Sequence, residues 1–306
     1  MEIFHLDLNN KDCLNVEVAA CIGYFDGLHL GHQALISKAK EVAKEKTIAS
    51  ALITFDLDPW IIIKKMCQYK YLTTYQKRIE MIEKFGIEFL IVLHFDEAMA
   101  KLTYQEFNLL LKERLHIDTI ICGFDFHYGH QGKGDVSTLS SFFPTIMIEE
   151  IKDTGEKISS TRISHCLKQG DVKQANRLLN YYYHVDGLVV KGKQKGRMIG
   201  FPTCNLAIDH KLLLPKPGVY LGYVKHANTM YKAMINIGHN PTFNLSLTPS
   251  VEVYILDFSQ YIYDQIITVY FNEYLRDEYK FESVEALIEQ LKKDEVQALK
   301  QSVYHE

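Results

Sequence analysis

The alternation of strand-like and helix-like segments ends near Tyr183, and this change constrains the fold more than any other feature. Before it, apolar β-rich segments alternate with amphipathic helical ones; after it, strand-like segments follow one another until a final helix. Alternation predicts a parallel sheet covered by helices, whereas consecutive strands broken by Gly, Pro and Asn predict an antiparallel barrel. In 306 residues we therefore expect two domains, an α/β domain over 1–183 and a β-barrel domain over 184–306.

The first half contains four segments that we expect to be strands, at 16–22, 48–55, 87–95 and 119–122. Helices are expected from Gly31 and after two predicted capping boxes, which open at Thr73 and Thr103. The carboxyl ends of parallel strands share one edge of the sheet, where ligands bind in such folds. The loops after Ile22, Phe55 and Cys122 are therefore expected to share that edge.

In the second half, five segments are expected to be strands, at 185–190, 218–224, 231–237, 250–258 and 265–271. Two short helices, at 159–167 and 171–181, are expected just before them. Ser283 is expected to cap a final helix, in which Val284, Leu287, Ile288 and Leu291 would form the face that packs onto the barrel.

Composition excludes several classes of function. A net charge of −4 and a pI near 6.4 argue against nucleic acid as a partner. The cysteines are scattered and predict reduced thiols in a cytosol, without disulfides or structural zinc; they are Cys13, Cys21, Cys67, Cys122, Cys166 and Cys204. The N-terminus has no signal-peptide pattern, and apolar runs are strand-sized. We expect a cytoplasmic protein that does not bind membranes.

The stretch GYFDGLHLGHQ, residues 23–33, separates an expected strand from an expected helix and reads as a cradle for nucleotide phosphates. We expect Gly23, Gly27 and Gly31 to permit turns with positive φ and to let a ligand approach the main chain around Phe25. His29 and His32 would donate hydrogen bonds to phosphate at the helix start and stabilise charge during nucleotidyl transfer. Taken alone, H-x-G-H is explained slightly better as a chance pattern in which the glycines only make a turn. Its place in the first strand-to-helix loop favours the phosphate site instead.

With GFDFHYGHQGKGD (123–135) and ISST (158–161), this stretch resembles the nucleotidyltransferase domain of prokaryotic riboflavin kinase/FAD synthetases. The resemblance implies that His29 and His32 bind ATP phosphates as catalytic residues. It further implies that the Gly-Phe-Asp-Phe loop, with Asp125 and Phe126, holds the flavin nucleotide. Ser160 and Thr161 would lie at a helix start near the phosphates.

The chain departs from the family's pattern at three positions. Asp58 stands where the family usually has His, and His127 and Ser164 stand where it usually has Arg. Each change removes a potential cation from an anion site, and a hydrogen bond to a charged group contributes about 1.5–3 kcal/mol. We therefore expect these departures to weaken adenylyl transfer, the activity of this domain, rather than the kinase activity.

A second glycine-rich stretch opens the barrel half. Gly192, Gly196 and Gly200 recur at four-residue spacing, so that the loop could close over phosphates through backbone N–H groups. Lys193, Lys195 and Arg197 add positive charge, and Thr203 and Asn205 offer oxygen atoms for phosphate or for Mg²⁺. Standing alone, this stretch would be a glycine-rich hairpin with a solvated basic tip.

It is followed in order by FPTCN (201–205), PGVY (217–220), NIGHNPTF (236–243) and LRDE (275–278), and the set resembles the riboflavin kinase domain. The resemblance implies that Thr203 and Asn205 engage Mg-ATP, that Glu252 is the catalytic base, and that Arg276 and Glu278 help to close the flavin site. By strand alternation Glu252 shares a face with Tyr254; that face could equally point to solvent.

The leading hypothesis is a bifunctional enzyme of FAD biosynthesis, which phosphorylates riboflavin to FMN with ATP and adenylylates FMN to FAD with release of pyrophosphate. Both steps would use Mg²⁺ as cofactor and ATP as co-substrate, with small molecules as partners. The alternative is a monofunctional riboflavin kinase whose N-terminal domain binds nucleotide or flavin but turns over poorly. A third hypothesis is a flavin- or nucleotide-binding regulator without catalysis. Oligomeric state, flavin redox state and nucleotide preference stay open.

Overall fold

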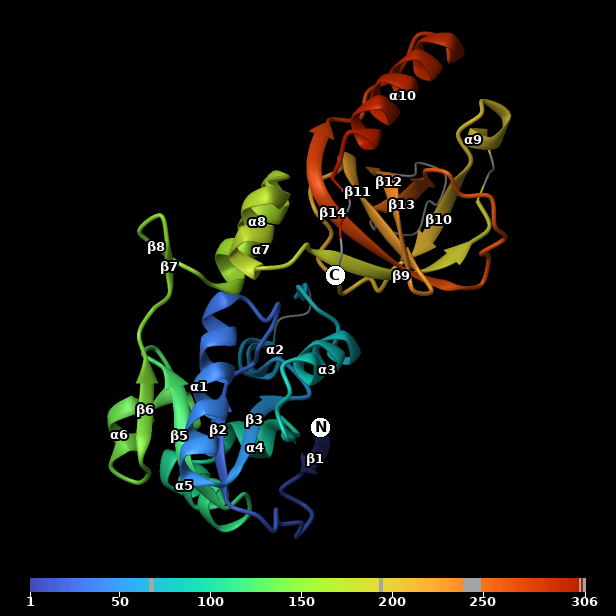
Figure 1. Ribbon diagram of the computed structural model, residues 1–306. Coiled ribbons are helices and arrows are strands. Elements are labelled where there is room, and N and C mark those ends of the chain that lie inside the picture. Colours follow the sequence, from blue (N-terminus) through green and yellow to red (C-terminus); the bar gives the residue numbers. More distant parts are fainter. Residues whose placement is uncertain (66–68, 193–194, 239–248, 303, 305–306) are drawn as a thin grey trace. The chain divides into compact units, whose positions relative to one another are not determined.

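The structure is a computed structural model that describes residues 1–65, 69–192, 195–238, 249–302 and 304. The chain divides into two compact units, Met1–Ser160 and Thr161–Glu306, and each is described here by itself (Figure 1). Helices α7 (Ser160–Gln169) and α8 (Val172–Leu179) lie between this division and the predicted boundary at Tyr183. That boundary stays a prediction.

Unit 1 is built on a sheet of six parallel strands, as the alternating pattern predicted. In spatial order the strands are β1 (Glu2–Leu6), β4 (Phe89–Leu93), β3 (Ala49–Phe55), β2 (Val18–Ile22), β5 (Ile117–Gly123) and β6 (Thr145–Ile148). Strands β1 and β6 were not predicted from the sequence. They are the edge strands and bury few side chains, so their apolar pattern is weak.

The order of the strands places the switch point of unit 1 between β2 and β5. From β2 the chain continues to β3 on one side, whereas β5 pairs with β2 on the other side. In open α/β sheets ligands bind beyond the carboxyl ends of the strands at such a point. The loops that follow β2 and β5 begin at Gly23 and Phe124 and carry the two glycine-rich stretches of the first half.

Helix α1 (Leu30–Lys46) packs against β2, β3 and β5 (Figure 1). Its buried side chains are spaced as an amphipathic helix requires; they are Leu35, Ile36, Ala39, Val42 and Ala43. The remaining elements of unit 1 are α2 (Pro59–Lys64), α3 (Tyr75–Lys84), α4 (Glu97–Lys101), α5 (Tyr104–Glu113), the short 3₁₀ turn η1 (His130–Gly132), α6 (Val136–Ser140) and the small hairpin of β7 (Lys152–Asp153) and β8 (Glu156–Lys157).

One of the two predicted capping boxes is confirmed and the other is wrong. At α5 the side chains of Thr103 and Glu106 exchange hydrogen bonds with each other's backbone N–H groups. Helix α3 instead begins one residue later than predicted, with Thr74 as N-cap and the N–H of Lys77 donating to its hydroxyl at 3.2 Å. Thr73 is drawn out of the helix because it bonds to the buried carboxylate of Asp26.

Unit 2 contains a closed antiparallel barrel, which confirms the predicted β fold. Around the barrel the strands are β10 (Thr203–Ala207), β13 (Ser250–Ile255), β12 (Thr229–Gly238), β11 (Gly218–His226), β14 (Ile266–Arg276) and β9 (His184–Val190), which pairs again with β10. Strand β10 was not predicted, because the same residues were interpreted as part of a phosphate loop.

The final helix, α10 (Val284–Leu299), begins after the predicted N-cap Ser283, whose hydroxyl accepts from the N–H of Ala286 at 3.1 Å. It packs on the outside of the barrel through a small apolar cluster. Helix residues Ile288, Leu291 and Ala298 there meet side chains of the barrel and its loops, namely Phe201, Leu221, Met234 and Leu256. The predicted apolar face is therefore confirmed for Ile288 and Leu291, while Val284 is 55% exposed.

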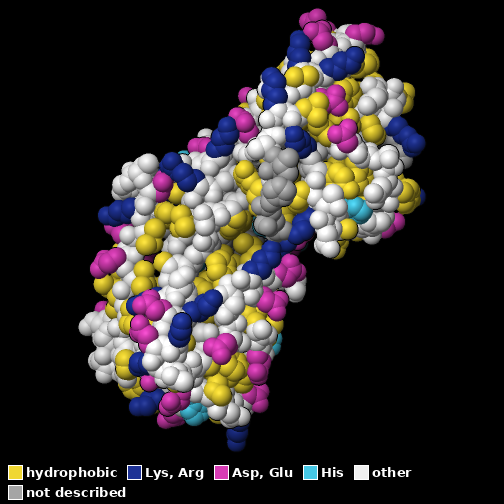
Figure 2. Space-filling model, in the orientation of Figure 1, with side chains coloured by type: hydrophobic (Ala, Val, Ile, Leu, Met, Phe, Trp, Pro, Cys, Tyr) yellow, Lys and Arg dark blue, Asp and Glu magenta, His cyan; other side chains and the backbone are white. Residues whose placement is uncertain are grey.

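Charged side chains do not separate into fields of one sign on the face that Figure 2 shows, where basic and acidic groups are intermixed. This distribution agrees with the small net charge of −4. A site for a polyanion must therefore be built locally, from side chains and backbone N–H groups that converge on it.

Candidate active sites

In unit 1 the chain leaves β2 and turns into α1 through the predicted cradle, which brings His29 and His32 together. His29 is the N-cap of α1, and its Nδ1 atom accepts from the N–H of His32 at 3.4 Å. The two rings stack with centroids 3.7 Å apart, and the ring of Phe25 lies 5.0 Å from that of His32. Because Nδ1 of His29 is an acceptor, the proton of its neutral ring is on Nε2.

Both imidazoles are held in the neutral form. Burial, with the positive charge of Lys157 nearby, lowers the pKa of His29 to about 4. Burial also lowers the pKa of His32 well below its ordinary value, and the adjacent His29 and Arg78 add to this effect. The Nδ1 atom of His32 is buried and has no hydrogen-bond partner among the described residues. The pair can therefore donate N–H groups to an anion at neutral pH, but it carries no charge of its own.

The prediction of positive φ for the three glycines of the cradle is confirmed for Gly27 and wrong for Gly23 and Gly31. Only Gly27 has a positive φ, 76°, while the other left-handed residues of the loop are Phe25 and Leu28. Gly31 lies in α1, where a Cβ atom would approach the His29 ring to 3.1 Å. Gly31 therefore leaves room for the His29 ring and does not make a turn. Gly23 also has no positive φ.

Asp26 and Arg78 brace this loop from within and were not singled out in the sequence. The Asp26 carboxylate is 4% exposed and accepts from the N–H groups of Leu72 and Thr73 and from the Thr73 hydroxyl. Burial raises its pKa above the ordinary value. The Ser160 hydroxyl donates to the Asp26 backbone oxygen at 2.9 Å, which ties the start of α7 to the cradle.

The Arg78 side chain is 2% exposed and joins the loops that follow β2 and β3. It donates to the backbone oxygens of Tyr24 at 2.9 Å and Phe55 at 2.8 Å, and its guanidinium lies 4.2 Å from the centroid of the Tyr24 ring. A buried arginine without apolar periodicity gives no signal in a sequence, so only the tertiary structure reveals this brace.

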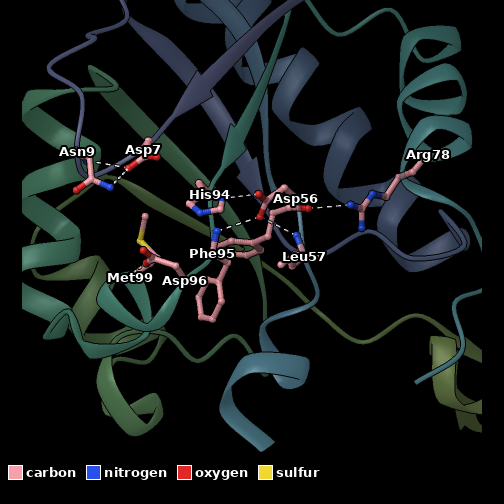
Figure 3. Close-up of polar contacts among 10 residues, drawn as sticks. Asp7, Asn9, Asp56, Leu57, Arg78, His94, Phe95, Asp96 and Met99 are labelled. Atoms are coloured by element: carbon pink, nitrogen blue, oxygen red, sulfur yellow. Dashed lines mark hydrogen bonds and ion pairs between the residues drawn. The ribbon is translucent and has the colours of Figure 1, made fainter. Parts of the chain in front are cut away.

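Beside this brace, the ends of β3 and β4 carry a second polar pair (Figure 3). Nδ1 of His94 lies 2.6 Å from Oδ2 of Asp56, whose other oxygen accepts from the N–H groups of Leu57 and Phe95. Figure 3 shows Arg78 reaching the same turn of the chain. Hydrogen bonding to Asp56 raises the pKa of His94, and the pair holds the two loops together.

Of the two predicted flavin residues in the loop after β5, Phe126 is packed against the core and Asp125 is exposed. The Phe126 ring packs against the core and stacks on Tyr128 at 5.5 Å, whereas the Phe124 ring is 38% exposed. Asp125 is exposed and forms an ion pair with Lys157. The Lys157 ammonium group also lies 4.6 Å from the centroid of the Phe124 ring. Lys157 is thus a cation close enough to the cradle to act on His29, and its place just before ISST is its only signal in the sequence.

The three departures from the family's pattern lie in different settings. Asp58 is 2% exposed and caps α2 by accepting from the N–H of Trp60 at 2.9 Å, and burial raises the pKa of its carboxyl. It is a helix cap rather than a surface anion. His127 is exposed, with Nδ1 3.0 Å from the Asp125 backbone oxygen. Thr161 and Ser164 both lie in α7, with Thr161 exposed.

Unit 2 contains a cavity of about 650 Å³ between the barrel wall and α10. Predicted site residues that line it are Gly196, Thr203, Glu252, Arg276 and Glu278. On β13 the side chains alternate, with Val251 and Val253 buried and with Glu252 and Tyr254 facing the cavity. The choice that alternation left open is thereby decided: the face that carries Glu252 lines the cavity.

A row of polar side chains crosses the barrel at the level of Glu252. Asn205 of β10 and Asn236 of β12 are its partners on the two neighbouring strands, so all three side chains share one face. The Thr203 hydroxyl lies 3.5 Å from Oε2 of Glu252. A Cβ atom on Gly192 would lie 2.0 Å from the Asn205 amide nitrogen, so this glycine leaves room for the asparagine.

The glycine-rich stretch before β10 was predicted to be a loop that closes over phosphates, and part of it forms the short helix α9 (Lys195–Met198). The N–H of Phe201 donates to the Gly196 oxygen at 2.9 Å, and a Cβ atom on Gly196 would lie 2.2 Å from the Phe201 oxygen. Only Gly200 has a positive φ, 83°. Lys193 and residues 239–243 of the predicted motif lie outside the described residues.

Arg276, at the end of β14, is held by α10. Its Nε and Nη2 atoms donate to Oδ2 of Asp294 at 3.0 and 2.7 Å, and Nη1 donates to the Asp277 backbone oxygen at 3.2 Å. The amide of Gln290 donates to Oδ1 of the same carboxylate at 2.8 Å. Asp294 is 2% exposed and lines the cavity. Asp294 lies 18 residues beyond Arg276, and no pattern in the sequence relates the two.

Glu278 lies next to this group and accepts from the Asn236 amide at 2.8 Å. A Cβ atom on Gly238 would lie 2.3 Å from Oε1 of Glu278, so this glycine lets the carboxylate approach β12. Oδ1 of Asn236 is buried and has no hydrogen-bond partner within the described part of the chain. A ligand hydroxyl could satisfy it.

Comparison with known proteins assigns the two halves of the chain to two family models. Residues 12–162 match the model for FAD synthetase, and residues 179–302 match the model for riboflavin kinase. A bifunctional riboflavin kinase/FMN adenylyltransferase from Listeria monocytogenes is 35% identical over 95% of this chain and 94% of its own length. The protein of the same name from Bacillus subtilis is 36% identical over 91% of this chain and 90% of its own.

A crystal structure described as a macrolide-efflux protein from Streptococcus pneumoniae is similar along nearly the whole chain. It is 32% identical, has a TM-score of 0.92, and covers 99% of this chain and all of its own. Within the residues that the structure of this chain describes, no helix has the length and apolar character needed to cross a membrane.

Proposed function

The chain belongs to the family of bifunctional riboflavin kinase/FMN adenylyltransferases, and from this premise we propose which of its residues carry each activity. It phosphorylates riboflavin to FMN and adenylylates FMN to FAD, with ATP as co-substrate of both steps. We assign the kinase step to the cavity of unit 2 and the adenylylation step to the cradle of unit 1.

In the kinase step Glu252 acts as the general base. Its carboxylate faces the cavity beside Thr203 and between two asparagines, where it can accept the proton of the terminal ribityl hydroxyl as that oxygen attacks the γ-phosphorus of ATP. The new O–P bond forms as the bond to ADP breaks. Arg276 and Glu278, which line the same cavity, contact the flavin in this proposal.

The oxygen donors beside Glu252 fit Mg²⁺. Thr203 and Asn205 lie two residues apart on β10 and therefore present a hydroxyl and an amide oxygen on one face, and Gly192 leaves room for the asparagine. Among the described residues no cluster of three His, Cys, Asp or Glu side chains could hold a metal. Mg²⁺ commonly takes only one or two protein ligands and completes its shell with water and substrate phosphate. Bound there, it would neutralise charge on the transferred phosphate.

In the adenylylation step the FMN phosphate oxygen attacks the α-phosphorus of ATP, and pyrophosphate leaves. His29 and His32 donate N–H groups to the phosphate oxygens, at the N-terminus of α1, where the helix dipole also favours negative charge. Lys157 supplies the positive charge that the neutral histidines lack. Ser160 and Thr161, at the start of α7, are the further phosphate ligands in this proposal.

The single observation that carries the kinase assignment is the row Asn205–Glu252–Asn236 on the cavity face of the barrel. Glu252→Gln keeps the shape of the side chain but removes the base, so we expect FMN formation to fall roughly 10²- to 10⁴-fold. Glu273→Gln, a strand carboxylate of the same barrel that does not line the cavity, is the matched control. If Glu252→Gln made FMN at the wild-type rate, Glu252 would not be the base.

The alternative is a monofunctional kinase whose first unit does not turn over, and it predicts that no FAD forms from FMN and Mg-ATP. The bifunctional proposal predicts that FAD does form, and that His29→Ala lowers the rate about 10²- to 10³-fold, the usual effect of losing one donor to a transition-state oxyanion. His5→Ala on the exposed side of β1 is the control. Absence of FAD from the wild-type protein, while FMN still forms from riboflavin, would establish the alternative.

A further inference from the structure

We propose that Asp294 of α10 is a positioning residue of the kinase site, which holds the Arg276 guanidinium at the cavity and makes the C-terminal helix part of that site. The proposal rests on the proposed role of Arg276 in flavin binding. Its starting point is that the barrel is already closed by its own strands, so α10 is not needed to complete the sheet. The helix nevertheless contributes one buried carboxylate, that of Asp294, to the lining of the cavity.

Hydrogen bonds fix the conformation of the Arg276 side chain. Two of its nitrogen atoms bond to Oδ2 of Asp294, and a third bonds to the Asp277 backbone. The guanidinium also lies 4.9 Å from the centroid of the Tyr279 ring and 5.9 Å from that of Phe281. Arginine side chains have many rotamers, so a partner that fixes the fork before the ligand arrives lowers the entropy cost of binding.

Asp294 is itself fixed. Its side chain is 3% exposed, and its second oxygen accepts from Gln290 one turn earlier on α10. A buried carboxylate with both oxygens occupied has a defined orientation, and it also balances the charge of Arg276 when no ligand is bound. Gln290 therefore orients Asp294, and Asp294 in turn orients Arg276, which lines the cavity.

A second contact from the same helix supports the inference. The Tyr254 hydroxyl, which shares the cavity face with Glu252, donates to Glu295 of α10 at 2.9 Å. Adjacent residues of α10 thus reach two groups that line the cavity, on β13 and on β14. On the opposite side of the helix, Glu289 and Lys293 pair with each other and are 71% and 64% exposed. Glu289 and Lys293 thus contact each other in this ion pair, whereas Asp294 and Glu295 contact the barrel strands.

The test compares Asp294→Asn with Glu289→Gln in the full chain. Asparagine keeps the volume of the side chain but loses the charge and the strong acceptor. We expect Asp294→Asn to raise KM for riboflavin about tenfold with a smaller change in kcat, the sign of lost ground-state binding. Glu289→Gln should behave as wild type. FAD formation from added FMN, which unit 1 catalyses, should be unchanged in both and measures the active protein.

A double-mutant cycle separates positioning from packing. If Asp294 acts through Arg276, then Asp294→Asn should change KM less than twofold in an Arg276→Gln background. Gln290→Leu, which removes the partner of Asp294, should raise KM in the same direction by a smaller factor and serves if Asp294→Asn does not fold. A wild-type KM for both Asp294→Asn and Gln290→Leu would overturn the proposal. A tenfold effect of Asp294→Asn on KM in the Arg276→Gln background would also overturn it. Absence of FMN from the wild-type protein would instead reject the proposed kinase function.

Discussion

At the scale of single residues, the cradle residue His29, which we propose binds phosphate, also makes the stability of the fold depend on pH. The pKa of His29 falls from the ordinary 6.5 to about 4 on folding because the ring is buried near Lys157. Between these values the unfolded chain binds a proton that the folded chain does not. The free energy of unfolding therefore decreases as the pH falls from 6.5 toward 4, and it is fully retained above 6.5.

We predict that His29→Gln flattens this dependence by up to about 1.4 kcal/mol per pH unit, the value for one proton. Denaturant unfolding between pH 4 and 7 measures it, with fluorescence from Trp60, the only tryptophan, as the signal for unit 1. The comparison must be with wild type, because the raised pKa of Asp26 acts in the opposite direction. Equal slopes for the two proteins would show that His29 titrates normally.

Gly192 provides a second prediction at this scale. A Cβ atom there would lie 2.0 Å from the Asn205 amide nitrogen, so Gly192→Ala must displace the asparagine. If Asn205 holds Mg-ATP, KM for Mg-ATP in the kinase step should rise about tenfold, as expected for one lost hydrogen bond to a charged group. The substitution should add little in an Asn205→Ala background. Additive effects of the two changes would contradict this explanation.

At the scale of elements, two adjacent threonines before α3 have separate tasks. Thr74 caps the helix, and Thr74→Ala should cost about 1 kcal/mol of stability. Thr73 donates to Asp26 and accepts from the N–H of Gly27 at 3.2 Å, so it supports the cradle loop. Thr73→Val removes both hydrogen bonds at a buried position and should cost about 1–3 kcal/mol.

The two variants should also differ in activity. We expect Thr73→Val to slow FAD formation beyond what its loss of stability explains, because the Gly27 turn loses its partner, whereas Thr74→Ala should leave the rate unchanged. Initial rates at a temperature where both proteins are folded make the comparison. Equal rates for the two variants would mean that the Asp26–Thr73 contact serves stability alone.

At the scale of the whole molecule, each proposed site is described from residues of one compact unit, apart from Thr161 at the start of α7. The two activities should therefore separate by mutation. We predict that a mixture of His29→Ala and Glu252→Gln proteins converts riboflavin to FAD, because FMN made by the first is a diffusible substrate for the second. A chain with both substitutions should make neither product from riboflavin.

The mixture is informative only if each variant keeps its other activity, which is measured as FMN from riboflavin for His29→Ala and FAD from added FMN for Glu252→Gln. Failure of the mixture, with both partial activities present, would show that FMN made by the His29→Ala protein stays bound to it and is not a diffusible substrate.

The sequence by itself determined those features that local pattern encodes. Apolar periodicity predicted the parallel sheet, the barrel and α10, and glycine and histidine spacing located the cradle after β2. Alternation paired Glu252 with Tyr254 but could not choose between cavity and solvent. Edge strands, β10 and the N-cap of α3 were missed or misplaced, because their local signals are weak or compete with a contact from elsewhere.

The tertiary structure alone decided which distant residues complete each site. Arg78 braces the loops after β2 and β3, Lys157 brings its charge to His29, and Asp294 holds Arg276. Each of these partners lies many positions away in the chain, so no period of two or 3.6 residues relates it to the group that it supports. Their energies come from burial and hydrogen bonding, which exist only once the sheet and the barrel have brought the elements together.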